Sequence, residues 1–193
     1  GTQSDKVWDA GHVGSKSVYI GLIDQGYEYN HPELTDAVGR NPGEIPDDSI
    51  DNDQNGYVDD VLGWDFYNNE NSVFDGPVDI HGTHVAGTIG AIGNNALGVA
   101  GVNWAVQMVA LKFLPDSGSG SSAAAISAID YYTNAAKAHD AGAGNYVGTN
   151  NSWGGGSQST AMLDAIVRAA KQDLLFVAAA GNGGSDQVGD NND

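Results

Sequence analysis

The run VYIGLI at residues 18–23 decides the fold, because it is a short apolar stretch rich in β-branched side chains that stops at Asp24. Such a run is typical of a strand buried on both faces, as the strands of parallel sheets are. Two further strands are predicted from VQMVALKF at residues 106–113 and from LLFVAAA at residues 174–180. The sequence therefore predicts a sheet whose strands are covered on both sides.

Helical patterns occupy segments between these runs. We predict one helix that begins near His81 with Asp79 as its cap, and two more over residues 121–139 and 159–172. Residues 146–150 are a candidate for a further strand. Strands that alternate with helices predict an α/β fold of three layers, with a parallel central sheet and helices on both faces.

Charge and cysteine content exclude several classes of function. The chain has 7 Lys and Arg against 25 Asp and Glu, a formal net charge of -18, so we expect no nucleic acid and no anionic membrane surface as a partner. The absence of cysteine excludes disulfides, thiolate-zinc sites and thiol catalysis. No apolar run reaches the roughly 20 residues that a membrane-spanning helix needs.

The negative charge is concentrated between Arg40 and Lys112, an interval without a basic side chain. A solvated acidic surface or a set of bound cations would account for it. Residues 51–60 (DNDQNGYVDD) favour cations, because oxygen-bearing side chains at the first, third and fifth places and glycine at the sixth resemble a calcium loop. The predicted calcium ligands are Asp51, Asp53, Asn55, the carbonyl of Tyr57, and Asp59 or Asp60. A weaker candidate comprises Asp65, Asn68 and Glu70.

Three polar residues lie where a parallel sheet concentrates chemistry. Asp24 and Asn182 follow predicted strands, and His81 opens a predicted helix. Ligands of parallel sheets bind beyond the carboxyl ends of the strands, so these side chains can share one crevice. An acid that orients an imidazole, an imidazole that carries a proton and an amide that donates to an oxyanion are parts of an acyl-transfer site. His81 and His84, three residues apart, also leave a metal site open.

Four motifs in order resemble those of the subtilisin-like serine proteases, the subtilases. They are IDQG with HPEL (residues 23–26 and 31–34), HGTHVAG (81–87), NSWGG (151–155) and AAAGN (178–182). The resemblance runs from about Val7 to the end of the chain. It implies that residues 1–193 are the N-terminal part of a single catalytic domain with the subtilisin-like fold. It also implies a secreted, extracellular, calcium-dependent serine endopeptidase that hydrolyses polypeptides through an acyl-enzyme.

The resemblance also assigns roles to individual residues. It implies that Asp24 is the triad acid, His81 the general base and Asn182 the oxyanion donor. Two segments would pair with the substrate backbone, and they comprise Gly118, Ser119 and Gly120, and Ser152, Trp153 and Gly154. A second calcium loop is implied after the histidine helix. Its ligands would be Gly93, Asn95, Leu97 and Val99, completed by Asp9 and Glu33.

The sequence departs from the family pattern at two places. Gln25 stands where the family usually has a Thr or Ser that supports the acid, so Gln25→Thr is expected to hold or raise activity. The Gly-Thr-Ser-Met-Ala motif of the nucleophile is absent, and Ser185 lies in a Gly-rich stretch without a following helix pattern. We therefore expect the serine on a missing or companion C-terminal segment, and no activity from this chain alone. A non-catalytic calcium- or peptide-binding module and a metallohydrolase using His81 and His84 remain open.

Overall fold

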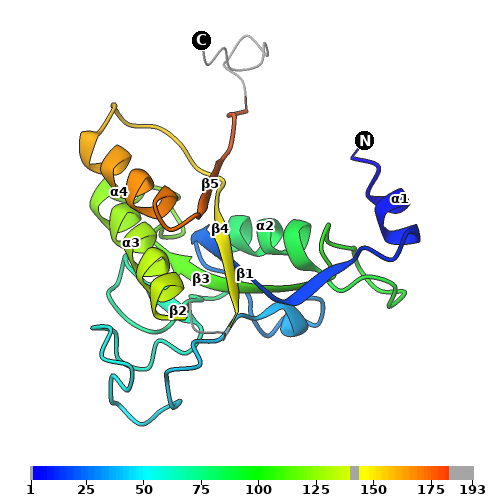
Figure 1. Ribbon diagram of the computed structural model, residues 1–193, viewed down its shortest axis with the longest axis horizontal. Coiled ribbons are helices and arrows are strands. Elements are labelled where there is room, and N and C mark those ends of the chain that lie inside the picture. The colour runs from blue at the N-terminus through cyan, green and yellow to red at the C-terminus, as the bar shows by residue number, and fades with distance from the viewer. Residues whose placement is uncertain (1, 140–143, 183–193) are drawn as a thin grey trace.

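A parallel sheet of five strands forms the centre of the computed structural model, which describes residues 2–139 and 144–182 (Figure 1). The strands are β1 (Gly14–Asp24), β2 (Gly63–Asp65), β3 (Ala105–Lys112), β4 (Asn145–Asn151) and β5 (Leu175–Ala178). The helices are α1 (Ser4–Asp9), the short 3-10 helix η1 (Thr35–Ala37), α2 (Ile80–Gly90), α3 (Ser122–His139) and α4 (Thr160–Ala170). The predicted α/β class is confirmed.

The strand order is β2-β3-β1-β4-β5, and the four strand pairings among the described residues are parallel. β1 therefore lies at the centre, between β3 and β4. Because the strands are parallel, their carboxyl ends lie at one edge of the sheet. Asp24 at the end of β1 pairs in register with Lys112 at the end of β3, so both reach that edge together.

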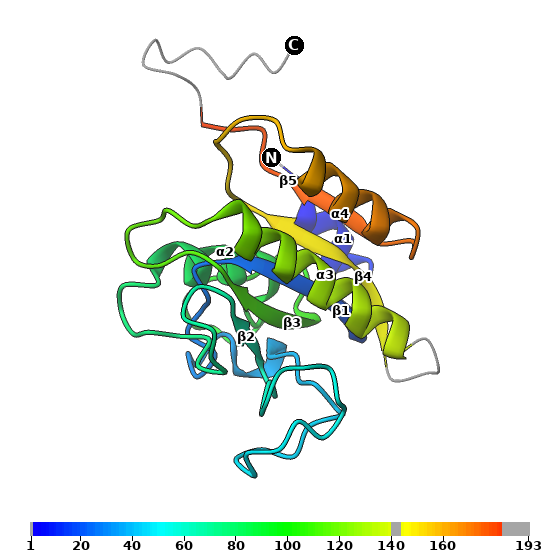
Figure 2. The same cartoon turned by 90° about the vertical axis from the view of Figure 1, so that its left-hand side faces the viewer.

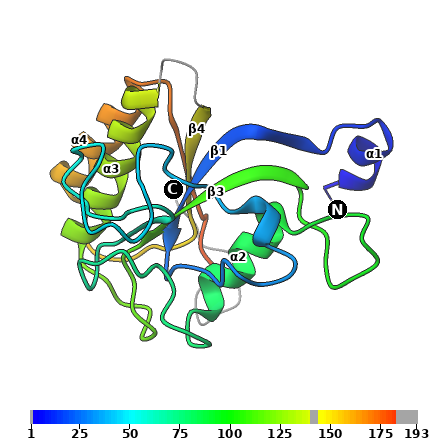
Figure 3. The same ribbon diagram turned by 90° about the horizontal axis from the view of Figure 1, so that it is seen from below.

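Alternating side chains of the central strands fill two separate cores. Ile23 and Leu111 pack in a cluster with residues of α3 and α4. Leu22 and Met108 point to the opposite face and pack in a cluster with α2 and η1. Figures 2 and 3 show the same layering, with α3 and α4 together on one face and α2 on the other. Burial on both faces explains why these strands read as continuous apolar runs.

The strand β5 departs from the prediction of a fully buried strand at residues 174–180. It is four residues long, and Leu175 and Val177 are 69% and 56% exposed. With Val147 of β4 and Ile89 of α2 they line an open hollow of about 300 Å³. β5 is buried less because α2 covers the β1 and β3 part of this face and leaves the β5 edge open.

Three elements were not expected from the sequence, namely α1, η1 and β2. β2 forms inside the long segment between η1 and α2, where Gly63 pairs with Ala110 of β3. A side chain at Gly63 would place its Cβ 1.8 Å from the Ala110 carbonyl oxygen, and Gly63 has φ +119°, so glycine is required there. Within the described ranges, no helix has the length and apolar character needed to cross a membrane.

Candidate active site

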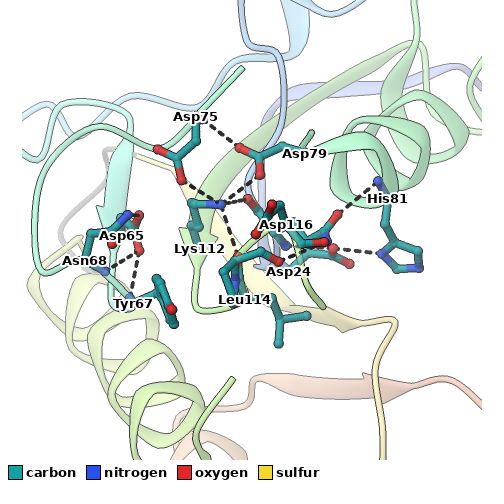
Figure 4. Close-up of polar contacts among 12 residues, drawn as sticks. Asp24, Asp65, Tyr67, Asn68, Asp75, Asp79, His81, Lys112, Leu114 and Asp116 are labelled. Atoms are coloured by element: carbon teal, nitrogen blue, oxygen red, sulfur yellow. Dashed lines mark hydrogen bonds and ion pairs between the residues drawn. The ribbon is translucent and has the colours of Figure 1, made fainter. Parts of the chain in front are cut away.

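Asp24 and His81 contact each other at the carboxyl edge of the sheet (Figure 4). The Asp24 side chain is fully buried, whereas the imidazole of His81 is 53% exposed. His81 Nδ1 lies 2.8 Å from Asp24 Oδ1. A carboxylate at this distance favours the tautomer in which Nδ1–H donates, which leaves Nε2 able to accept a proton. The pair can therefore work as an oriented general base.

Two glycines allow the histidine helix to approach the end of β1 closely. Gly26 has φ +86°, a left-handed conformation that turns the chain after Asp24. A Cβ at Gly82 would lie 1.9 Å from the carbonyl oxygen of Gly26. Any larger residue at position 82 would separate α2 from the strand end and His81 from Asp24. Gly82, the first glycine of the HGTHVAG motif, is thus a packing requirement.

The Asp24 carboxylate lies in a desolvated position. Oδ1 accepts the Gln25 N–H at 2.7 Å in addition to the His81 ring, while Oδ2 has no hydrogen-bond partner within the described part of the chain. Burial raises the pKa of Asp24, against the lowering effects of the bonds from His81 and Gln25 and of the charge on Lys112. In such surroundings an imidazolium and a carboxylate attract each other more strongly than in water.

Lys112 is a buried cation at this edge to which the sequence analysis assigned no role. Its Nζ donates to Asp79 Oδ1 (2.9 Å), to the Gln25 carbonyl (2.5 Å) and to the Leu114 carbonyl (3.1 Å), and it lies 3.2 Å from Asp75 Oδ2 (Figure 4). One ammonium group thereby joins the ends of β1 and β3 to the start of α2. The available signal was a lysine inside the apolar run VQMVALKF.

Asp79 occupies the expected N-cap position of α2, but its side chain does not cap the helix. The carboxylate accepts instead from Lys112 and from the backbone N–H of Asp75 (2.7 Å). The backbone N–H of His81 finds its acceptor in the side chain of Gln25 (3.2 Å). The prediction was wrong about the cap because a buried ammonium is a stronger partner for a carboxylate than a helix amide is.

Asn182 lies four residues beyond β5 and is exposed. Because β5 is parallel to β4 and β4 to β1, Asn182 follows the carboxyl edge at which Asp24 lies. Its oxyanion role stays a prediction. Ser185 lies outside the described residues.

A cavity of about 620 Å³ lies between the segments that follow β3 and β4. Five of the six predicted substrate-binding residues line it, namely Gly118, Ser119, Gly120, Trp153 and Gly154. Ser152 does not line it, and its hydroxyl accepts from the Asn150 amide at 2.9 Å. Trp153 packs edge-on against Phe113 with ring centroids 5.0 Å apart, so one wall is a firm aromatic surface.

The acidic loop brings together carboxylates that could hold a cation. Ligand oxygens of Glu44, Asp51 and Asp53 lie within 4.8 Å of one another. Glu44 was not a predicted ligand, because the calcium pattern considers spacing within residues 51–60 only. Its two oxygens accept backbone N–H groups of Asn52, Asp53 and Asp59, so it also ties the loop together.

Asp60, one of the two alternatives predicted to complete the calcium shell, lies apart from this group. Asp60 is fully buried and outside the acidic group, and it accepts from Asn41 (2.8 Å), Asn55 (2.8 Å) and the Tyr131 hydroxyl (2.5 Å). Burial raises the pKa of Asp60 in spite of these bonds. Tyr57 points its ring at Tyr131, with centroids 5.1 Å apart. Asp60 therefore anchors the loop to α3.

The second predicted calcium loop is partly assembled. The Asn95 amide donates to both oxygens of Glu33 at 3.2 Å each, and Asn95 Oδ1 accepts the Leu97 N–H. Glu33 and Val99 line a cavity of about 580 Å³, whereas the predicted ligands Asp9, Gly93 and Leu97 are not among the residues that line it. The structure therefore brings Asn95 to Glu33, and the ligand set as a whole stays a prediction.

The weaker candidate brings together two of its three predicted members, Asp65 and Glu70, with a further carboxylate. Carboxylates of Asp65, Glu70 and Asp75 lie within 4.8 Å of one another, and the Asn68 amide donates to Asp65 instead of offering its oxygen. Neither His81 nor His84 belongs to a cluster of metal-ligating side chains in the described ranges. The ring of His81 is held by Asp24, which weakens the metallohydrolase alternative.

An Asp–His pair at the carboxyl edge of a parallel sheet, beside a cavity between two loops, defines the acid–base part of a hydrolase site. The sequence profile of the Subtilase family matches residues 15–193, and the chain belongs to that family.

Several known proteins are similar to this chain in sequence or in structure. The chain is 35% identical to subtilisin-like protease 1 of Plasmodium berghei, over 84% of this chain and 26% of that protein. It is 34% identical to subtilisin DY of Bacillus licheniformis, over 95% of this chain and 53% of that protein. A cold-adapted subtilisin-like serine proteinase has a similar structure, with a TM-score of 0.60 and 32% identity over 86% of this chain and 46% of that one. The chain thus spans about a quarter to a half of the length of these relatives.

The Lys112–Asp79 contact gives the first prediction. Lys112→Met should lower the free energy of unfolding by about 3–5 kcal/mol, because it leaves the buried Asp79 carboxylate without its counter-charge. The control is Lys137→Met, which changes an exposed lysine and should cost about 0.5 kcal/mol or less. Denaturant unfolding measures both. Equal losses would show that the buried pair does not hold this edge together.

Proposed function

We propose that the chain supplies the acid and base of a serine endopeptidase that hydrolyses polypeptides through an acyl-enzyme. The observation that supports this most strongly is the 2.8 Å contact between His81 Nδ1 and a fully buried Asp24, in a chain of the Subtilase family. Asp24 holds the ring and stabilises its charged form. His81 Nε2 takes the proton of the nucleophilic hydroxyl and later returns it to the leaving amine.

The other steps depend on residues along the same edge. The side-chain N–H of Asn182 donates to the oxyanion of the tetrahedral intermediate. The substrate lies extended between residues 118–120 and 152–154 and pairs with their main chain. Apolar side chains in the cavity support a preference for apolar substrate residues, and they are Phe113, Leu114, Met162 and Ile166.

We propose that the nucleophilic serine lies on a C-terminal segment or on a companion chain. The absence of the Gly-Thr-Ser-Met-Ala motif supports this, as does the exposed apolar surface of Leu175 and Val177 beside an open strand edge. Such an edge offers unpaired backbone groups to another chain. The missing motif equally supports the second candidate, a non-catalytic calcium- or peptide-binding module.

We also propose that the protein is secreted and binds calcium. The carboxylate group of Glu44, Asp51 and Asp53 suits a hard cation that takes oxygen ligands. A bound divalent ion offsets the repulsion of the acidic interval, and extracellular surroundings supply calcium at the concentrations that such loops need.

A serine-directed probe separates the two candidates. A fluorophosphonate should label no residue within 1–193, and it should label a C-terminal segment or companion chain in the purified protein. The reason is that labelling needs a hydroxyl next to an oriented base, and only the absent motif provides that serine. Labelling of Ser152 would contradict the assignment, and no labelling in the whole protein would favour the non-catalytic module.

In the protein that carries the serine, substitutions of the assigned residues should have different effects on kcat and KM. His81→Ala removes the proton carrier and should lower kcat by several orders of magnitude, and Asp24→Asn should cost somewhat less. Asn182→Ala should lower kcat about 10²–10³-fold with little change in KM, the range established for the oxyanion amide of subtilisin. His84→Ala, on the same helix, is the control and should stay near wild type. Steady-state kinetics on a chromogenic peptide checks all four.

Calcium removal should destabilise the fold. Calcium at about 100 times its Kd contributes roughly 2.7 kcal/mol, so an excess of chelator should lower Tm by several degrees and added calcium should restore it. Asp51→Asn and Asp53→Asn should reduce this calcium dependence, whereas Asp164→Asn on the exposed side of α4 should not. Differential scanning calorimetry measures the shift. If chelator does not change the Tm of the wild type, the calcium proposal fails and the acidic interval is surface charge only.

A further inference from the structure

Gln25 joins three segments that meet at the active edge. It follows Asp24 directly, and its side chain is largely buried. Its Oε1 accepts the backbone N–H of His81 at 3.2 Å, and its Nε2 donates to the carbonyls of Pro115 (3.1 Å) and Asp116 (3.4 Å). The end of β1, the start of α2 and the loop after β3 are thus linked through one amide group.

The histidine helix has a particular need for this amide. The first N–H groups of a helix have no partner within the helix and depend on a capping side chain. Asp79 holds the capping position, but its carboxylate is bound to Lys112. Gln25 therefore provides the acceptor for His81 from outside the helix. The two carbonyls that face Nε2 fix the orientation of the amide, because only the oxygen can then face the N–H of His81.

The two bonds of residue 25 reach both members of the catalytic pair. Its backbone N–H donates to Asp24 Oδ1 at 2.7 Å, and its side chain holds the backbone of His81. Asp24 holds the imidazole ring through Oδ1 alone, since Oδ2 has no partner in the described part of the chain. One hydrogen bond leaves the ring free to pivot about it. The bond from Gln25 to the His81 backbone fixes the point from which the imidazole extends toward Asp24.

We propose that Gln25 is a positioning residue that keeps the His81 imidazole aligned with Asp24 for proton transfer. This inference rests on the proposed peptidase function. The Thr or Ser that usually stands here in subtilases is too short to span from β1 to both α2 and the Pro115 carbonyl. The geometry therefore reverses the expectation from sequence, and Gln25→Thr should lower activity.

The test compares variants of the whole protein that includes the serine segment. Gln25→Met keeps the length of the side chain and removes its three hydrogen bonds. It should lower kcat about tenfold, the equivalent of one lost hydrogen bond of roughly 1.4 kcal/mol in the transition state. KM should stay within about twofold, because the substrate loops remain in place. Gln25→Thr should lower kcat to a similar extent.

A matched control and a second rate separate positioning from general damage. Gln107→Met makes the same chemical change in β3, where the amide donates to the carbonyls of Asp36 and Val106 away from the site. It should leave kcat unchanged. The rate of phosphonylation by a small fluorophosphonate should fall in Gln25→Met as kcat does, since this reagent needs the base but not the peptide-binding loops.

Hydrogen exchange tests the positioning independently of catalysis. In Gln25→Met the backbone amide of His81 should exchange faster than in wild type, because it has lost its acceptor, whereas Gln107→Met should not change it. An unchanged kcat in Gln25→Met, or a raised KM at constant kcat, overturns the proposal while the peptidase function stands. If the wild type cleaves no peptide, the proposed function falls. In that case, unchanged exchange at the His81 amide in Gln25→Met overturns the positioning role of Gln25 too.

Discussion

The buried ion pair of Lys112 and Asp79 is the contact on which the rest of this edge depends. Both side chains are fully excluded from solvent, and a buried charge is tolerated only where a partner and further hydrogen bonds satisfy it. Lys112 also bonds the carbonyl of Gln25, so the ends of two neighbouring strands and the start of α2 share one ammonium group. The contact between Asp24 and His81 is built on that arrangement, because the first residue ends β1 and the second opens α2.

The acidic interval contains single carboxylates that are buried and bonded to their surroundings, and carboxylates that gather in a cluster. Asp60 and Asp65 are buried and receive amide or hydroxyl donors from their surroundings, and burial raises the pKa of each. The ligand oxygens of Glu44, Asp51 and Asp53 lie within 4.8 Å of one another, so their negative charges repel. The loop is therefore held to the body of the protein by internal bonds at Asp60, while the cluster around Glu44 is the part whose charge a cation would compensate.

The parallel sheet explains why residues far apart in sequence serve one purpose. Residues after β1, β3, β4 and β5 all lie along its carboxyl edge, which places Asp24, the segments at 118–120 and 152–154, and Asn182 along that edge. β5 differs from the central strands, because its apolar residues Leu175 and Val177 are exposed. An apolar surface beside an outer strand favours association, so this face of β5 is suited to contact with another segment.

Local pattern determined the class of fold and predicted that Asp24 and His81 form a pair, which the structure brings into contact. Apolar runs, helix periodicity and the HGTHVAG motif depend on neighbouring residues, so the sequence alone predicted β1, β3, α3 and the roles of Asp24 and His81. Only the tertiary structure decided the supporting contacts. The Asp79 carboxylate binds Lys112 and does not cap α2, and the Gln25 side chain accepts the His81 N–H in its place. Glu44 lies in the acidic cluster, and Asp60 accepts from the Tyr131 hydroxyl. Each of these contacts joins residues distant in sequence or replaces a contact with a nearby residue. Sequence spacing does not show which of two partners a side chain will bind. Burial and charge in the folded chain rank them.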